Sequence, residues 1–341
     1  MWDQVNQLST NSACNRKVTS SQLSIINYQL SIMLDPFQET IWPLGDQIEA
    51  IIDFIVGNFR YIFNDWIGQP VGVVLRGIQA FFVNIPPLIF LVALFGLAWQ
   101  IASRNIAILS VVAMTVVGLI GAWEESMITL ALVITAVFFC VIIGIPLGIA
   151  AARSDRFAAL IRPVLDTMQT LPAFVYLVPV VMLFGTGEVP GVIVTFVFAV
   201  PPLIRLTNIG IRGVPEDVVE ASQAFGATPR QVLLQTQIPL AMPTILAGVN
   251  QSLMLALSMV VIASLIAVEG LGQMVNRGIG RLDVGLAAVG GVGIVLLAIT
   301  LDRITQAVGD TTKGRPHWKK RGPIGFVLNF FREKQPKEAI Q

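Results

Sequence analysis

Long apolar runs dominate the sequence between residues 84 and 303, and they determine the predicted structure. A hydrocarbon core about 30 Å thick is crossed by a helix of about 20 apolar residues. The sequence holds seven runs of approximately that length, at 84–102, 106–123, 127–150, 172–186, 189–209, 243–268 and 285–303. The run at 172–186 is short, which suits a tilted or broken helix. The pattern therefore predicts an all-α, polytopic membrane protein with about seven transmembrane helices.

Two amphipathic stretches precede the first span. Between residues 46 and 66, isoleucines recur at helical spacing while acidic residues occupy the opposite face. Such a segment is too charged to cross a membrane and is typical of a helix lying at the interface. A second stretch covers about 70–83. We therefore predict three parts: an external tail with interfacial helices (1–83), a transmembrane domain (84–309) and a basic tail (310–341).

Composition supports a membrane location. Hydrophobic residues make up 55% of the chain and charged residues 13%, whereas a soluble domain carries about 25% charged residues. Membrane lipid is thus an expected partner. Basic residues do not form a stripe interleaved with aromatic residues, so no nucleic-acid partner is expected.

The distribution of basic residues predicts the orientation, because cytoplasmic connections are enriched in Lys and Arg. Arginines occur near residue 104 and in the connections at 151–171 and 210–242, and the tail after 304 is basic. The connections at 123–125 and 185–190 have none. An exception is the connection at 269–284, which carries Arg277 and Arg281. We expect the N-terminus outside and the C-terminus in the cytoplasm.

The connection at 210–242 has the start and stop signals of two helices joined by a turn. Pro215, followed by two acidic residues, suits the start of a helix, and Gly226 can adopt the left-handed conformation that stops one. Thr228, Pro229 and Gln231 form a capping box for a second helix, which we expect Pro239 to end.

This connection also carries apolar residues that we expect to be exposed: Val218, Val219, Phe225, Val232, Leu233 and Leu234. A small projection with an apolar surface fits a groove on another protein. The alternative is a well-capped connection without a partner, although loops of about 30 residues without a function are uncommon.

The run Glu220-Ala221-Ser222, with Gly226 four residues later and Pro239 further on, resembles the EAA coupling loop of ATP-binding-cassette importer permeases. In that family the loop sits in a cleft of the ATPase subunit and transmits its closure to the membrane helices. The resemblance implies a type I importer transmembrane domain (MetI-like) with a coupling loop at about 213–240. It implies these ATPase-coupling residues: Glu220, Ala221, Ser222, Phe225, Gly226, Ala227, Thr228 and Pro239.

Four further stretches are similar to the permeases of glycine betaine/proline betaine uptake systems: 166–185, 198–231, 247–268 and 278–286. This likeness implies a bacterial inner-membrane protein that imports osmoprotectants and takes part in osmoregulation. It also implies a homodimer, a cytoplasmic ABC ATPase subunit and an external (periplasmic) substrate-binding protein. Choline or carnitine remain alternative substrates. Departures from the family pattern include Ser222, Thr236 and Glu269.

The sequence contains no GxxxxGK[ST] motif and only one histidine, so we expect no ATP site, no metal site and no catalytic residue in this chain. ATP and magnesium would be bound by the partner ATPase. Apart from Asp302, acidic residues avoid the predicted spans, which disfavours the alternative of an ion-coupled secondary transporter or channel. A non-transporting membrane scaffold is a further alternative.

Polar residues in the span 243–268 are candidates for the translocation pathway: Asn250, Gln251, Ser252 and Ser258. Polar side chains within a span usually face the helix bundle, and hydrogen bonding between helices is an equally good explanation. Glu220 could accept hydrogen bonds from the turn amides, or be a solvated carboxylate. Gly144 and Gly148 would allow close helix approach.

Overall fold

The computed structural model describes residues 44–310, and within that range the chain forms helices and no strands. The all-α prediction is confirmed. The predicted N-terminal tail up to residue 43 and the basic tail from 311 lie outside the described residues. The chain divides into two units, residues 1–58 and 59–341. The described part of the first unit is the beginning of α2 (Leu44–Phe63), which falls within the predicted amphipathic segment.

The second unit follows α2 with a π-helical turn at 64–68 and continues as a series of helices. They are α3 (Gln69–Asn84), α4 (Pro87–Ile101), α5 (Arg104–Leu119), α6 (Trp123–Phe139), α7 (Ile145–Arg153), α8 (Asp155–Thr170), α9 (Ala173–Phe184), α10 (Glu188–Arg212), α11 (Glu216–Ala224), α12 (Pro229–Gln231), α13 (Ile238–Ala263), α14 (Leu271–Arg281) and α15 (Val284–Asp310).

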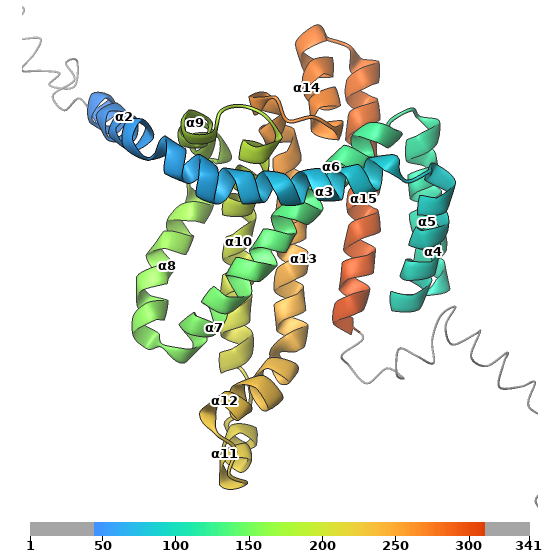
Figure 1. Ribbon diagram of the computed structural model, residues 1–341. Helices are drawn as coiled ribbons and strands as arrows, with labels where there is room; N and C mark the ends of the chain where they lie inside the picture. The colour runs from blue at the N-terminus through green and yellow to red at the C-terminus, as the bar shows by residue number, and fades with distance from the viewer. Residues whose placement is uncertain (1–43, 311–341) are drawn as a thin grey trace, which may run out of the picture. The chain divides into compact units, whose positions relative to one another are not determined.

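Three long helices, α10, α13 and α15, run side by side through the second unit (Figure 1). α10 leads into α11 and α12, α13 returns to the opposite end, and α14 and α15 form a hairpin there. We call these the α11 end and the α14 end. α3 lies crosswise over the bundle and packs on α6 and α10 (Figure 1).

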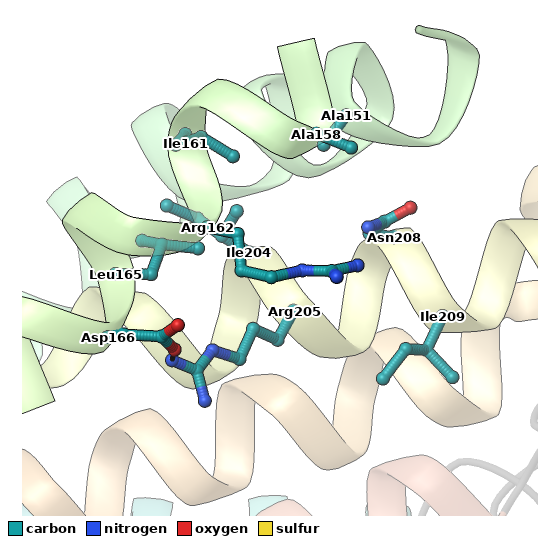
Figure 2. A pocket seen from close by; sticks show the side chains of 10 residues that line it. All are labelled: Ala151, Ala158, Ile161, Arg162, Leu165, Asp166, Ile204, Arg205, Asn208 and Ile209. Atoms are coloured by element: carbon teal, nitrogen blue, oxygen red, sulfur yellow. Dashed lines mark hydrogen bonds and ion pairs between the residues drawn. The ribbon is translucent and has the colours of Figure 1, made fainter. Parts of the chain in front are cut away.

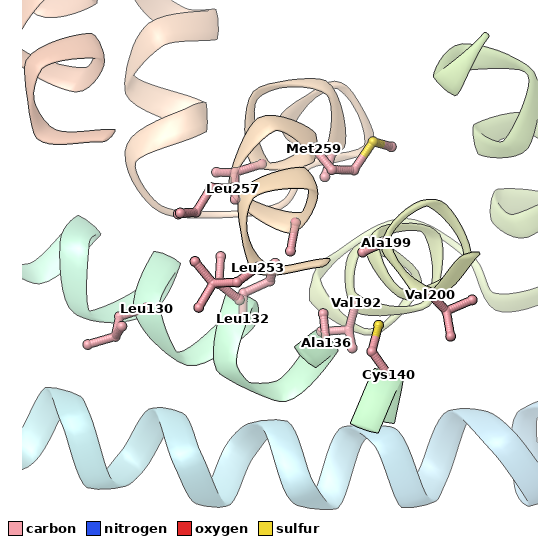
Figure 3. Packing of buried hydrophobic residues seen from close by; sticks show 14 of the residues in the cluster. Leu130, Leu132, Ala136, Cys140, Val192, Ala199, Val200, Leu253, Leu257 and Met259 are labelled. Atoms are coloured by element: carbon pink, nitrogen blue, oxygen red, sulfur yellow. The ribbon is translucent and has the colours of Figure 1, made fainter. Parts of the chain in front are cut away.

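The core lies where α6, α10 and α13 meet (Figure 3). Leu132, Val192, Leu253 and Met259 interdigitate there and are almost completely buried. α7 approaches α10 closely because Gly148 has no side chain. A Cβ atom at this position would lie 2.5 Å from the Cβ of Thr207, which confirms the predicted close contact.

The observed spans differ from the predicted set. Within residues 44–310, five helical stretches are long and apolar enough to cross a membrane: 45–84, 123–153, 188–212, 229–266 and 284–309. The predicted spans at 84–102 and 106–123 correspond to α4 and α5, which have only 15 and 16 residues. At 1.5 Å per residue each is about 22–24 Å long, short of a full crossing. Pro86 and the Ser103 cap fix their starts.

The predicted connection at 151–171 is itself largely helical, since most of it is α8. Only Ser154 separates α7 from α8, and its hydroxyl caps α8 by accepting a hydrogen bond from the Phe157 amide. α8 and α9 together form one broken apolar segment with a bend of 101°. The bend falls at Leu171, which precedes Pro172 and is therefore held in an extended conformation.

Candidate functional site

The turn chemistry predicted for residues 213–240 is confirmed. Gly226 has a φ of +84°, in the left-handed region where only glycine is unstrained. The Thr228 hydroxyl accepts a hydrogen bond from the Gln231 amide, and the Gln231 side chain accepts one from the Thr228 amide at 2.8 Å. This capping box starts α12. The 213–240 segment therefore projects as a compact, locally ordered unit at the α11 end (Figure 1).

Pro239 does not end the second helix, as the sequence analysis expected. The chain passes from α12 through a π-helical turn (Val232–Gln237) directly into α13, giving a helical stretch of 38 residues from Pro229 to Ile266. Pro239 lies in the first turn of α13. Because a π turn already departs from the regular hydrogen-bond ladder, the missing proline N–H does not break the helix. The part of the projecting unit from Pro229 onward is therefore the end of the long α13 stretch.

The apolar surface of the 213–240 segment is smaller than predicted. Val232 and Leu233 are 3% and 7% exposed, because they pack inward at the base of the segment. Phe225 at the turn is 93% exposed, and Leu234 is 52% exposed. Val218 is also exposed. The remaining surface is still unusual, since a phenylalanine that is 93% exposed has no packing role among residues 44–310.

Glu220 does not bind the turn, which contradicts the first of the two possibilities considered. Its side chain is exposed, and within residues 44–310 it makes no hydrogen bond or ion pair. The turn amides are already satisfied by carbonyl groups: Gly226 donates to Gln223 at 2.8 Å and Ala227 to Ser222 at 3.2 Å. Glu220 is thus available to a partner.

Two departures from the family pattern contact each other. The hydroxyl groups of Ser222 on α11 and Thr236 in the π-helical turn are 3.3 Å apart and share a hydrogen bond. The bond joins α11 to the π-helical turn that leads into α13. The two helical parts of the 213–240 segment are thus linked by a side-chain contact as well as by the Gly226 turn.

The predicted pathway residues separate into two groups. Gln251 and Ser258 are exposed on one face of α13, together with Ala247 and Met254. Their spacing of three and four residues places them in a single stripe. This stripe is a partly polar face on a spanning helix, directly continuous with the projecting unit.

Asn250 and Ser252 lie elsewhere. Asn250 donates a hydrogen bond to Asp302 on α15 at 3.1 Å and accepts one from Thr305, so it joins α13 to α15. Ser252 is buried, and its hydroxyl has no partner in the described part of the chain. The geometry therefore assigns these two residues to helix packing.

Two ion pairs join α10 to α8, and sequence analysis missed both. Arg205 pairs with Asp166 at 2.5 Å, and Arg212 pairs with Asp155 at 2.6 Å. Arg212 also donates to the Ala151 carbonyl. A signal was available for the first pair, since Arg205 falls inside the apolar run at 189–209, and a charge within a span needs a partner.

Comparison with known proteins agrees with this architecture. Residues 144–313 match the family described as binding-protein-dependent transport system inner membrane component. The glycine betaine/proline betaine transport system permease protein ProW of Escherichia coli (strain K12) is 56% identical over 301 residues, covering 88% of this chain and 85% of the relative. The glycine betaine transport system permease protein OpuAB of Bacillus subtilis (strain 168) is 42% identical, covering 80% and 96%.

Among solved structures, an inward-facing form of the MetNI methionine ABC transporter aligns with a TM-score of 0.50 and 20% identity. The alignment covers 55% of this chain and 93% of that one. It supports the MetI-like fold alone.

Fold and family together define a multi-pass permease of the inner membrane. The chain belongs to the family of binding-protein-dependent transport permeases that includes the glycine betaine/proline betaine permeases named above.

Proposed function

We propose that the chain is the membrane-spanning subunit of an ATP-driven importer of glycine betaine- and proline betaine-type osmoprotectants. The identity of 56% to a permease of that name supports the substrate class. One observation supports the mechanism most directly: the exposed turn at Gly226 leads directly into the helical stretch Pro229–Ile266, whose polar stripe includes Gln251.

Because the helix is continuous, movement of the 213–240 segment by an ATPase can be transmitted to α13. A separate ATPase subunit, which binds ATP and magnesium, contacts the segment through Phe225 and Leu234. Closure of two ATPase subunits moves two copies of the segment, and each copy carries its α13 along. In a homodimer with facing stripes, Gln251 and Ser258 line the pathway, and their displacement alternately opens it to each side. This chain supplies no catalytic residue for the hydrolysis.

The orientation is proposed from charge. The α11 end carries the arginines of α8 and of the α10 C-terminus, so the positive-inside rule puts it in the cytoplasm. The α14 end then faces outward, with the N-terminus outside and the basic tail inside. α3, crosswise to the bundle, lies at the outer interface and meets membrane lipid.

The function is tested by reconstitution of purified components in liposomes. With the chain, its ATPase and an external binding protein loaded with radiolabelled glycine betaine, we expect uptake that depends on ATP. Omitting either partner abolishes it. Proline betaine should compete, whereas choline and carnitine at equal concentration should compete less. Uptake by this chain alone under an ion gradient would support the secondary transporter instead.

We propose that the binding protein docks at the tip of the α14–α15 hairpin, next to the two outer arginines. Ile279, Leu282 and Val284, at the tip of the α14–α15 hairpin, are 63%, 89% and 81% exposed. Leu282 has a φ of +56°, a strained conformation for a bulky residue. Beside them, Arg277 and Arg281 are exposed and make no ion pair within residues 44–310. A binding-protein surface with apolar residues and a rim of acidic side chains complements this tip.

Replacing both tip arginines with glutamine is expected to weaken docking of the binding protein about tenfold, because rim charges steer association. The measurement is uptake rate against binding-protein concentration, where half-saturation should shift upward and lose its dependence on salt. Arg104→Gln, a single arginine change at the other end, serves as the control. An unchanged half-saturation in the tip variant would refute this docking site.

A further inference from the structure

An open cavity between α8 and α10 at the α11 end is lined by an exposed arginine, Arg162, that has no partner among residues 44–310. The cavity measures about 210 Å³, and the Arg205–Asp166 ion pair that joins α10 to α8 lies in its lining (Figure 2). Alanines at 151 and 158 leave space for it. Arg162 extends from α8 between the two helices toward Asn208 (Figure 2).

The cavity presents two unsatisfied hydrogen-bond donors. Unlike Arg205 and Arg212, Arg162 makes no hydrogen bond or ion pair with any residue from 44 to 310. The Asn208 carbonyl oxygen accepts a bond from the Nε of Arg212 at 2.8 Å. That bond orients the amide so that its NH₂ group is left to donate. A guanidinium and an amide that converge in this way bind an oxyanion.

The net charge also favours an anion. Arg205 is neutralised by Asp166, so the positive charge of Arg162 is the uncompensated one among the residues that line the cavity. The remaining lining is aliphatic: Ala151, Ala158, Ile161, Leu165, Ile204 and Ile209. None of these described side chains is aromatic, so a quaternary ammonium group would find no π face to bind.

We propose that this cavity binds the phosphate of an anionic phospholipid headgroup. The aliphatic lining of the cavity reaches the protein surface at Ile209 on α10, which is 60% exposed. An acyl chain can lie along this surface while the phosphate contacts Arg162. A basic pocket between membrane helices with apolar flanks is a recognised form of lipid site. Only the assignment to the cytoplasmic leaflet rests on the proposed function.

The test compares lipid binding by the purified full-length chain and two variants in native mass spectrometry. Arg162→Gln should lower the affinity for phosphatidylglycerol about tenfold, the value of one charge-assisted hydrogen bond. Arg156→Gln is the matched control, since Arg156 is an exposed arginine on the same helix outside the cavity. It should retain wild-type affinity.

Two displacement measurements distinguish a lipid phosphate from other anions that the cavity could bind. Neither inorganic phosphate nor glycine betaine should displace the bound lipid at millimolar concentration. Equal lipid affinity in all three proteins would overturn the proposal, and so would displacement by glycine betaine, which would assign the cavity to a substrate carboxylate. No ATPase or binding protein is present in the assay, so its outcome is independent of the transport function.

Discussion

Replacing Gly226 with valine is expected to reduce ATP-driven uptake at least tenfold while leaving the protein in the membrane. Gly226 has a φ of +84° and is exposed, with no atom within 4 Å of a Cβ placed on it. The cost of the change is therefore conformational, about 1–2 kcal/mol for a non-glycine residue in the left-handed region and more for a β-branched one. Valine should force the turn to rearrange and displace Phe225.

Gly226→Asn provides the matched control, since asparagine tolerates the left-handed conformation. It should retain uptake within about threefold of wild type, although its side chain is similar in size to valine. Immunoblots of membrane fractions and co-purification of the ATPase separate loss of docking from loss of insertion. Wild-type uptake by the valine variant would remove the turn from the coupling mechanism.

Introducing two glycines at Leu234 and Gln235 is expected to uncouple ATP hydrolysis from transport. Both residues are exposed in the π-helical turn between α12 and α13, so their replacement removes little packing. Each glycine costs about 1 kcal/mol relative to alanine in a helix and adds backbone freedom where the motion of the segment passes to α13. The ratio of glycine betaine imported to ATP hydrolysed should fall about tenfold.

The paired variant Leu234→Ala/Gln235→Ala removes the same side chains but preserves the helix. It should keep the wild-type ratio, even if loss of Leu234 weakens ATPase docking and lowers both rates together. Equal ratios in the glycine and alanine variants would mean that helix continuity is not needed for coupling.

Local turn chemistry was predictable from sequence, and helix continuity was not. The capping box at Thr228 and the conformation of Gly226 depend on neighbouring residues alone, so the sequence analysis found both. Pro239 was interpreted as a helix end because the π-helical turn before it has no sequence signature. Val232 and Leu233 were interpreted as exposed because their burial depends on packing at the base of the segment.

The sequence partly predicts which polar residues of α13 share a face. Gln251 and Ser258 are seven residues apart and so share a face, whereas Asn250 is rotated by about 100°. The identity of its partners on α15 depends on how the helices pack, which a single sequence does not reveal. A broken helix was expected at 172–186, but its first half, α8, was interpreted as a polar connection because it carries Arg156, Arg162 and Asp166.

The central claim is that the 213–240 segment and α13 move as one body, and a distance measurement during turnover tests it directly. Spin labels at Gln235 and Gln251, with Cys14 and Cys140 replaced, are about 24 Å apart along a continuous helix. Labelled chains are diluted with unlabelled ones so that distances within one chain dominate. The account predicts the same narrow distribution in nucleotide-free and ATP-trapped assemblies. A broadened or shifted distribution on ATP binding would contradict it.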